Sequence, residues 1–256
     1  MPSITKNDII TGLRNLGLKP GDAVLTHSSL SSFGYVDGGA DAVIDAIIES
    51  VSQGGTVLFP TLTGNENLSP DNPPVFDVAN TPCWTGLIPE TARKRQDFIR
   101  SAHPTHSVCA SGKEAERFIE SHEFSPTPCG EGSPYDKLVE AGGYILLIGV
   151  GHECNTTMHY CEEMAGVPYH LQEKEAYAMV RYPDGRTADV PVRLHKYGIP
   201  RNFARLEPEF LANGIQTEGR IGESIIKLVK ANKMAEMVLA YLRKDPFFLV
   251  TKDAGR

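Results

Sequence analysis

The stretch YILLIGVGHECNTTMHYCEE, residues 144–163, decides the fold because it joins a strand to a helix through a glycine-rich turn. The run YILLIGV is almost continuously apolar, as expected of a strand that is covered on both faces of a sheet. Asn155 is a good N-cap, so residues 156–164 are predicted to form a helix. A strand that leads directly into a helix is typical of an α/β protein.

The same alternation extends to both sides of this stretch. Thr5 and Asp8 have capping-box spacing for a first helix, and residues 22–62 read as a strand–helix–strand unit. Alternating runs at 176–194, about the turn PDGR, predict a β-hairpin that belongs to the same sheet system. The remaining elements are predicted as a strand-like segment at 98–112 and helices at 113–122, 135–143 and 234–246. We expect one α/β domain, residues 1–256.

Residues 64–90 interrupt this regular pattern. The segment is rich in proline and asparagine and follows neither the helical nor the strand period. Long loops of this kind are usually kept for function. We expect a lid or a wall of the substrate site, carrying the single tryptophan, Trp84.

Charge and composition narrow the classes of partner. The formal net charge is −7, so the protein is expected to repel nucleic acid and anionic membranes and to suit a cationic partner. The N-terminal sequence resembles no signal peptide and no run is long enough to span a membrane, which predicts a cytoplasmic protein. The five cysteines form no C-x-x-C pair, which argues against a disulfide framework and a zinc knuckle.

His159 and Glu162 are the first candidates for catalysis. In the predicted helix they lie three positions apart on one face, which places a carboxylate beside an imidazole. A carboxylate that binds one ring nitrogen fixes the tautomer and raises the basicity of the other nitrogen, as a general base requires. Cys161 and Glu163 are expected to point elsewhere. The alternative is a surface helix with a solvated ion pair.

Two further segments carry reactive side chains at predicted strand ends, where α/β proteins bind ligands. HSS at 27–29 offers an imidazole and two hydroxyls, and RSAHPTHS at 100–107 holds His103 and His106. The alternatives are an ordinary turn for the first segment and, for His106, a buried histidine bonded to the backbone. Neither GVGH nor GYVDGGADAV has the spacing of a P-loop or a dinucleotide fingerprint, so we exclude a nucleotide site of either type.

A zinc site is the rival interpretation. It would draw its ligands from His103, His106, His152, Cys154 and His159. The spacings match neither H-E-x-x-H nor a cysteine-pair site.

Together, these segments resemble the aminoglycoside 3-N-acetyltransferase family. The resemblance rests on THSSLSSFGYVDGGADAVIDAI, GTVLFPTLT, VFDVANTPCWTGLIPE, RSAHPTHSVCASG and GVGHECNTTMHYCEE, in this order, and covers nearly the whole chain. It implies a central mixed sheet flanked by helices, a fold unrelated to that of the common acetyltransferase superfamily. It also implies acetyl transfer from acetyl-coenzyme A to the 3-amino group of a 2-deoxystreptamine antibiotic, with no metal.

The resemblance gives the candidate residues their roles. His159 is the expected general base, oriented by Glu162. The residues expected to line the coenzyme A channel are His27, Ser28, Ser29, Ser101, His103, Ser107, Val150 and Gly151. The carboxylates expected to bind the cationic acceptor are Asp71, Asp77, Glu90, Glu207, Glu218 and Glu223.

Three functional alternatives stay open at this stage. They are a metal-dependent hydrolase using His103, His106, His152 and His159, an acetyltransferase for a non-antibiotic amine, and a catalytically idle binder of a polycation. GHEC stands where the family more often has G-H-D-S, and Glu223 stands where a small residue is commoner. Both departures bear on substrate range, so acetyl transfer is implied more directly than antibiotic resistance. The assembly is expected to be a monomer or a homodimer.

Overall fold

The computed structural model describes residues 3–52 and 54–251, and within them the strands form one sheet of seven strands and one of three. The centre of the larger sheet is parallel, because β1 (Ala23–Ser28) pairs in that sense with β2 (Thr56–Pro60) and β6 (Tyr144–Ile148). Antiparallel pairs complete it in the order β4-β5-β2-β1-β6-β10-β9, with β4 (Ile99–Arg100), β5 (Val108–Gly112), β9 (Gln216–Ile221) and β10 (Ser224–Lys230). The predicted mixed sheet is confirmed.

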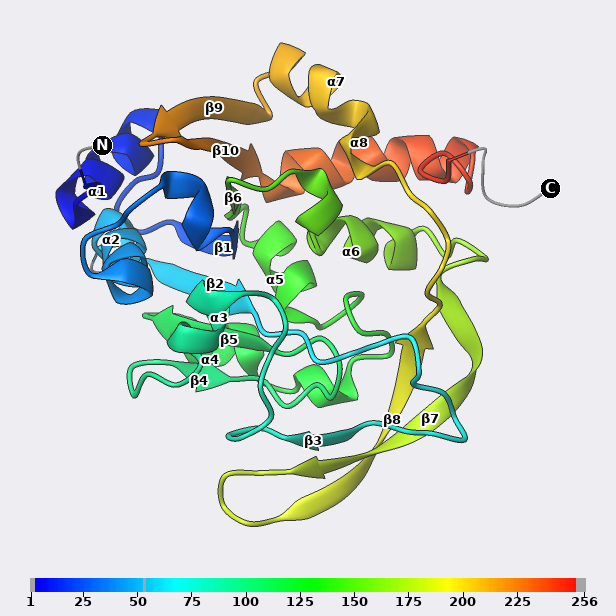
Figure 1. Cartoon of the computed structure of the whole chain (residues 1–256). Coiled ribbons are helices and arrows are strands. Elements are labelled where there is room, and N and C mark those ends of the chain that lie inside the picture. Colours follow the sequence, from blue (N-terminus) through cyan, green and yellow to red (C-terminus); the bar gives the residue numbers. More distant parts are fainter. Residues whose placement is uncertain (1–2, 53, 252–256) are drawn as a thin grey trace.

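Helices cover both faces of this sheet (Figure 1), because successive strand residues point to opposite sides. Leu25 of β1 packs in one apolar cluster with Met158, whereas its neighbour Val24 packs in another with Ile9. The first cluster includes residues of α4 (Ala115–Ile119), α5 (Pro134–Glu140), α6 (Thr157–Met164), α7 (Glu207–Ala212) and α8 (Ala231–Lys244), and the second those of α1 (Lys6–Leu16), α2 (Gly39–Val51) and α3 (Leu87–Ala92). The sheet is therefore buried on both sides, as its apolar strands predict.

The predicted hairpin forms, but it does not join the larger sheet as expected. β7 (Leu171–Arg181) and β8 (Thr187–His195) pair with each other, and β7 also pairs with β3 (Val75–Asp77) from the long loop. The physical reason is that β7 pairs along one edge with β3 from the long loop rather than with a strand of the larger sheet, while only one face of the hairpin is buried. That face packs in small clusters, one of them with Phe76 of β3 and Ala102. In Figure 1 the hairpin curves away from the main sheet.

Local signals placed several boundaries correctly. Thr5 caps α1 in a capping box with Asp8, as predicted. The helix predicted from residue 156 with Asn155 as N-cap instead starts at Thr157, with Thr156 at the N-cap position, although Asn155 Oδ1 still accepts the amide of Thr157 at 3.1 Å. The helices predicted at 113–122 and 135–143 are present but shorter, as α4 and α5. The hairpin of β9 and β10 was not predicted. Short 3-10 turns lie at Leu30–Phe33, His122–Phe124, His152–Cys154 and Phe203–Leu206.

The turn after β6 requires glycine at position 149. Gly149 has a φ of 62°, and its amide donates to the Ile225 carbonyl of β10 at 2.8 Å. A Cβ at this position would lie 1.9 Å from Ser32 Oγ. The close approach of Ser32 therefore fixes where the chain leaves β6 and enters the segment that leads to α6.

Gly149→Ala is expected to lower the free energy of unfolding more than Gly166→Ala. Both glycines are left-handed, with φ of 62° and 64°. Both variants therefore incur a backbone penalty of about 1–2 kcal/mol. Only at position 149 would the new methyl group overlap a side chain, since no described atom lies within 4 Å of a Cβ built on Gly166. Urea denaturation measures the difference, and equal losses would contradict the packing described here.

Candidate active site

A cavity of about 380 Å³ opens at the carboxyl ends of β1 and β6. The segment 26–28 at the end of β1 forms one part of its wall, and residues between β6 and α6 form another. The long loop contributes a third part, which includes Trp84 and Gly86. The remaining lining residues include His106, His159, His195 and Tyr197. This is the edge at which open α/β sheets bind ligands.

His159 stands at the cavity wall and is held by Glu162. Its Nδ1 lies 2.7 Å from Glu162 Oε2, so the spacing of three residues on α6 produced the predicted pair. The imidazole stacks on His170 at 4.8 Å and meets the edge of Phe203 at 5.1 Å. Because Nδ1 is engaged, Nε2 is the ring atom free to act at the cavity, with no hydrogen-bond partner in the described part of the chain.

Electrostatics make Glu162 a carboxylate and His159 a neutral base. Glu162 is fully buried, and its other oxygen accepts Nε–H of Arg201 at 2.7 Å. Burial opposes its ionisation, but the hydrogen bond from His159 and the charge of Arg201 outweigh burial and hold the pKa of Glu162 at about 2. Burial lowers the pKa of His159, although the bond to Glu162 acts in the opposite direction. The imidazole is thus neutral near pH 7, with Nε2 unprotonated.

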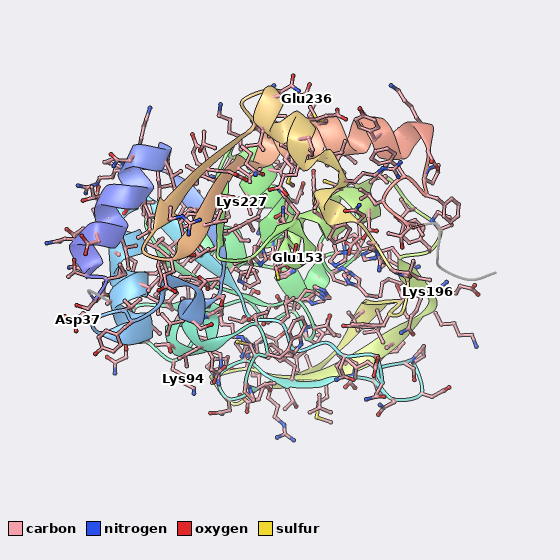
Figure 2. All side chains as sticks on the ribbon, turned by 45° about the horizontal axis from the view of Figure 1, so that its top comes forward. Asp37, Lys94, Glu153, Lys196, Lys227 and Glu236 are labelled. Carbon is pink, nitrogen blue, oxygen red and sulfur yellow. The ribbon has the colours of Figure 1, made fainter. Side chains whose placement is uncertain are left out.

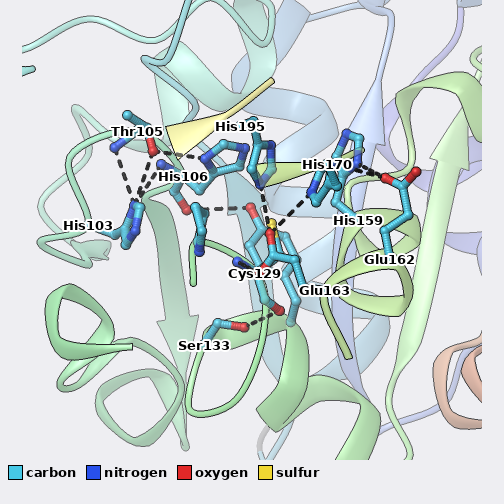
Figure 3. Close-up of polar contacts among 12 residues, drawn as sticks. His103, Thr105, His106, Cys129, Ser133, His159, Glu162, Glu163, His170 and His195 are labelled. Carbon is cyan, nitrogen blue, oxygen red and sulfur yellow. Dashed lines mark hydrogen bonds and ion pairs between the residues drawn. The ribbon is translucent and has the colours of Figure 1, made fainter. Parts of the chain in front are cut away.

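Glu163 does not point away from the site, which corrects the sequence-based expectation. Its Oε1 lies 2.7 Å from His195 Nε2 and 3.3 Å from His170 Nε2, and its Oε2 accepts the amide of Cys129 at 2.8 Å (Figure 3). Burial again opposes ionisation, but these bonds hold the pKa of Glu163 well below its usual value. Cys161 is buried in the core and takes no part. Two adjacent carboxylates therefore orient two imidazoles.

The segment at the end of β1 lies where the sequence predicts a ligand. His27 Nε2 accepts the amide of Thr156 at 3.3 Å, and burial lowers the pKa of His27 to about 3, so this imidazole is neutral. The hydroxyl oxygens of Thr26 and Ser28 are buried without a hydrogen-bond partner among the described residues. Ser29 lies in an adjoining hollow of about 610 Å³, which shares Ser28 and Gly86 with the cavity. Together the two hollows suit an elongated ligand.

The segment RSAHPTHS is largely buried. His103 is buried, accepts the amide of His106 on Nδ1 at 3.0 Å and stacks on His122. Ser101 bonds His122, and Ser107 donates to the Thr61 carbonyl at 2.7 Å. Ser101, His103 and Ser107 are absent from the described lining of the cavity, to which His106 belongs, and their role towards coenzyme A stays a prediction.

Near the start of α6, Val150 lines the cavity, whereas Gly151 is absent from its described lining and donates its amide to Glu153 Oε1 at 2.8 Å. Glu153 is the one carboxylate among the described lining residues. Figure 2 places it near the middle of the face shown, far from Asp37 and Glu236 at the periphery.

The six carboxylates predicted to bind an acceptor are dispersed, and none belongs to the described lining of the cavity. Glu90 pairs with Arg93, Glu207 pairs with Lys227, and Asp77 accepts the amides of its own turn. Glu218 accepts a bond from Gln216, Asp71 is exposed, and Glu223 lies beside Gly34. Their role as acceptor ligands stays a prediction.

The ligand set of the zinc hypothesis does not assemble. His152 Nε2 binds Gln216 at 2.7 Å, and His103 faces His122. The clusters that the described residues do form are His106 with Cys129 and His195, and His159 with His170 and His195. In both clusters Nε2 of His195 is already bound to Glu163. The arrangement of the second cluster is that of imidazoles oriented by carboxylates.

Sequence reasoning missed His170, His195 and Arg201. His195 ends β8 and contacts α6 across 32 positions, and Arg201 reaches Glu162 across 39. The signal that could have found them was Glu163 itself, since a second glutamate on a helix that packs against the core requires partners.

A scan against protein families matches residues 25–243 to the aminoglycoside 3-N-acetyltransferases. The chain belongs to this family. Its curated relatives include aminoglycoside N(3)-acetyltransferase IV of Salmonella sp, 31% identical over 98% of this chain and 92% of that protein. The assignment makes the chain an acetyltransferase by family, and the predicted family and fold are confirmed.

Two solved structures of relatives contain bound ligands. A mutant of aminoglycoside acetyltransferase AAC(3)-IVa in complex with a gentamicin superposes with a TM-score of 0.83 and 29% identity, over 97% of this chain and 92% of that one. The binary complex of AAC-IIIb with CoASH superposes with a TM-score of 0.81 and 30% identity, over 95% of this chain and 97% of that one. Among the described residues, no helix combines the length and apolar character needed to cross a membrane.

Glu162→Gln is expected to weaken the acid dependence of stability. The folded pKa of Glu162, about 2, lies below its ordinary value of 4.5, so its charge stabilises the fold above about pH 4.5 and this contribution is lost as the pH falls towards 2. The variant should be less stable throughout, because Arg201 loses its partner, yet its free energy of unfolding should fall less steeply over this window, by up to about 1.4 kcal/mol per pH unit. Denaturant titrations at stepped pH test this, and identical slopes would contradict it.

Proposed function

We propose that this protein transfers an acetyl group from acetyl-coenzyme A to the 3-amino group of a 2-deoxystreptamine aminoglycoside. The observation that carries the proposal is the His159–Glu162 pair at 2.7 Å, placed at the wall of the cavity. Membership of the family supports the reaction, and the gentamicin and CoASH complexes of relatives support the two substrates.

His159 acts as the general base. Nε2 takes a proton from the acceptor nitrogen as that nitrogen attacks the thioester carbonyl. Glu162 keeps the proton on Nδ1 and stabilises the imidazolium that forms, while Arg201 prevents the carboxylate from taking up the proton itself. The C–N bond forms first, and when the tetrahedral intermediate collapses the C–S bond breaks and the proton held by His159 passes to the leaving sulfur.

The cavity and the adjoining hollow at the end of β1 suit coenzyme A. The unpartnered hydroxyls of Thr26 and Ser28 are available to bind amides or the thioester oxygen. The adjoining hollow with Ser29 extends the cavity away from His159, as a long pantetheine arm requires. Ser101, His103 and Ser107 support the cavity wall through hydrogen bonds to their neighbours.

The acceptor enters from the side of the long loop and the hairpin. Trp84 and Tyr197 offer aromatic surface there, and Glu153 offers a negative charge. The six dispersed carboxylates would attract a polycation over a longer range. We further propose a single domain over residues 1–256, a cytoplasmic location and a monomeric or homodimeric state. An acetyltransferase for a non-antibiotic amine is the alternative that keeps the same chemistry.

The experiment that tests the proposal measures thiol release from acetyl-coenzyme A with a panel of aminoglycosides that have or lack a free 3-amino group. Release that depends on this group is the expected result. A blank without acceptor corrects for the protein's own cysteines, of which Cys154 is exposed. If the protein binds coenzyme A but releases thiol with no aminoglycoside of the panel, the proposed acceptor is wrong. If it does not bind coenzyme A, the proposed reaction is wrong.

His159→Ala is expected to lower kcat on the order of a hundredfold or more, the usual contribution of a general base, with little change in the fold. Met164→Ala is the matched control, because Met164 is an exposed residue of the same helix. Steady-state kinetics at neutral pH measure both variants. Full turnover by His159→Ala would remove His159 from the mechanism.

A further inference from the structure

A second carboxylate–imidazole pair faces the cavity beside the first. His195, the last residue of β8, lies 2.7 Å from Glu163 through Nε2, and its ring lines the cavity 5.1 Å from the ring of His159 (Figure 3). The proposed function uses one imidazole only. Its neighbour, oriented by a carboxylate in the same way, has no assigned task.

The two histidines have opposite tautomers. Glu162 binds Nδ1 of His159, so its proton is on Nδ1 and Nε2 is the free acceptor. Glu163 binds Nε2 of His195, so its proton is on Nε2 and Nδ1 is the acceptor. Nδ1 of His195 has no hydrogen-bond partner within the described ranges. Each of these two cavity-lining rings therefore keeps one nitrogen with a free lone pair.

Glu163 differs from Glu162 in its countercharge. Glu162 binds Arg201, whereas Glu163, which is also fully buried, has only His170 and His195 as ion-pair partners in the described residues. A buried carboxylate without a cation is costly. A proton taken up by His195 would supply the missing positive charge beside Glu163.

The proposed reaction releases two protons from the acceptor nitrogen. An amine that is protonated at neutral pH reacts as R–NH₃⁺ + CH₃CO–SCoA → R–NH–COCH₃ + HSCoA + H⁺. One proton ends on the sulfur that leaves, and the other goes to solvent. A single imidazole would have to accept two protons in succession in each turnover, whereas two imidazoles would accept one proton each.

We propose that His195, oriented by Glu163, is a second catalytic residue that takes the first proton from the acceptor's ammonium group and releases it to solvent, leaving His159 to take the second. The proton that His159 removes passes to the sulfur as the C–S bond breaks. This inference rests on the proposed function, since it assigns a further residue to the same reaction.

The surroundings of His195 agree with a base that is neutral before the acceptor binds. Burial, then the neighbouring imidazoles His170 and His106, hold the pKa of His195 well below its ordinary value, and Glu163 acts in the opposite direction. The titratable groups that face His195 are His106 from the β4–β5 loop, Cys129 from the segment before α5, His159 and Glu163 from α6, and His170 from the segment before β7. The ring is thus unprotonated when the acceptor arrives, and a proton that it takes up lies next to Glu163 before it passes to solvent.

The competing explanation is that His195 merely fastens the hairpin to α6. The variant His195→Gln separates the two, because the glutamine amide can still donate to Glu163 but cannot accept a proton. Its kcat/KM is measured from pH 6 to 10 with an aminoglycoside that the wild type acetylates, with circular dichroism to check the fold. Glu163→Gln and His159→Ala are measured alongside.

If His195 is the first base, His195→Gln lowers kcat/KM on the order of tenfold to a hundredfold near pH 7. Above the pKa of the acceptor amine, the kcat/KM of this variant should rise to within a few-fold of the wild-type value. At such pH the acceptor nitrogen binds as a neutral amine, so the first proton transfer is not needed. Glu163→Gln should show the same recovery, whereas His159→Ala should stay low throughout. A loss of equal size at every pH, or no loss, would overturn the role of His195 and leave the proposed function standing. Absence of turnover by the wild type would overturn both.

Discussion

The burial of two consecutive negative charges on α6 is the constraint on which this structure depends. The side chains of Glu162 and Glu163 are both inaccessible to solvent, and among the described residues they share only His170, which lies 3.3 Å from each through its two ring nitrogens. The two carboxylates together need several donors beyond α6, and these come from Cys129, His170, His195 and Arg201. The ends of β8 and of the segment after it are thereby held against the core. The same bonds hold imidazoles at the cavity, so one set of interactions serves both fold and site.

The strands of the larger sheet determine the positions of these imidazoles. β1 and β6 are parallel neighbours and end at the same edge, where His27 and the turn at Gly149 begin the walls of the cavity. α6 follows at once and carries His159 to that edge. Other histidines of the chain serve the wall itself, as His103 does by accepting backbone amides. The environment of each ring, rather than its residue type, separates histidines such as His103, which binds backbone amides, from those that line the cavity.

Local chemistry made part of this predictable. The polar residue Asn155 before the helix and the spacing of three residues between His159 and Glu162 are short-range features, and each leads to an observed contact, although the N-cap position falls on Thr156, one residue later than predicted. The contacts of Glu163 depend on residues 32 and 34 positions away, and no periodicity in the sequence links them. The hairpin at 176–194 was visible, but its separation from the main sheet depends on β3, three residues within a segment that has no strand pattern.

The central claim is that neighbouring carboxylates fix opposite tautomers on two neighbouring histidines, and long-range ¹H–¹⁵N correlation spectra of the histidine rings test it most directly. Spectra of the free protein near neutral pH, assigned with His159 and His195 variants, report which nitrogen of each ring carries the proton. The account predicts a proton on Nδ1 of His159 and on Nε2 of His195, with the other nitrogen of each ring unprotonated. The same tautomer on both rings, or two protons on either ring, would contradict it.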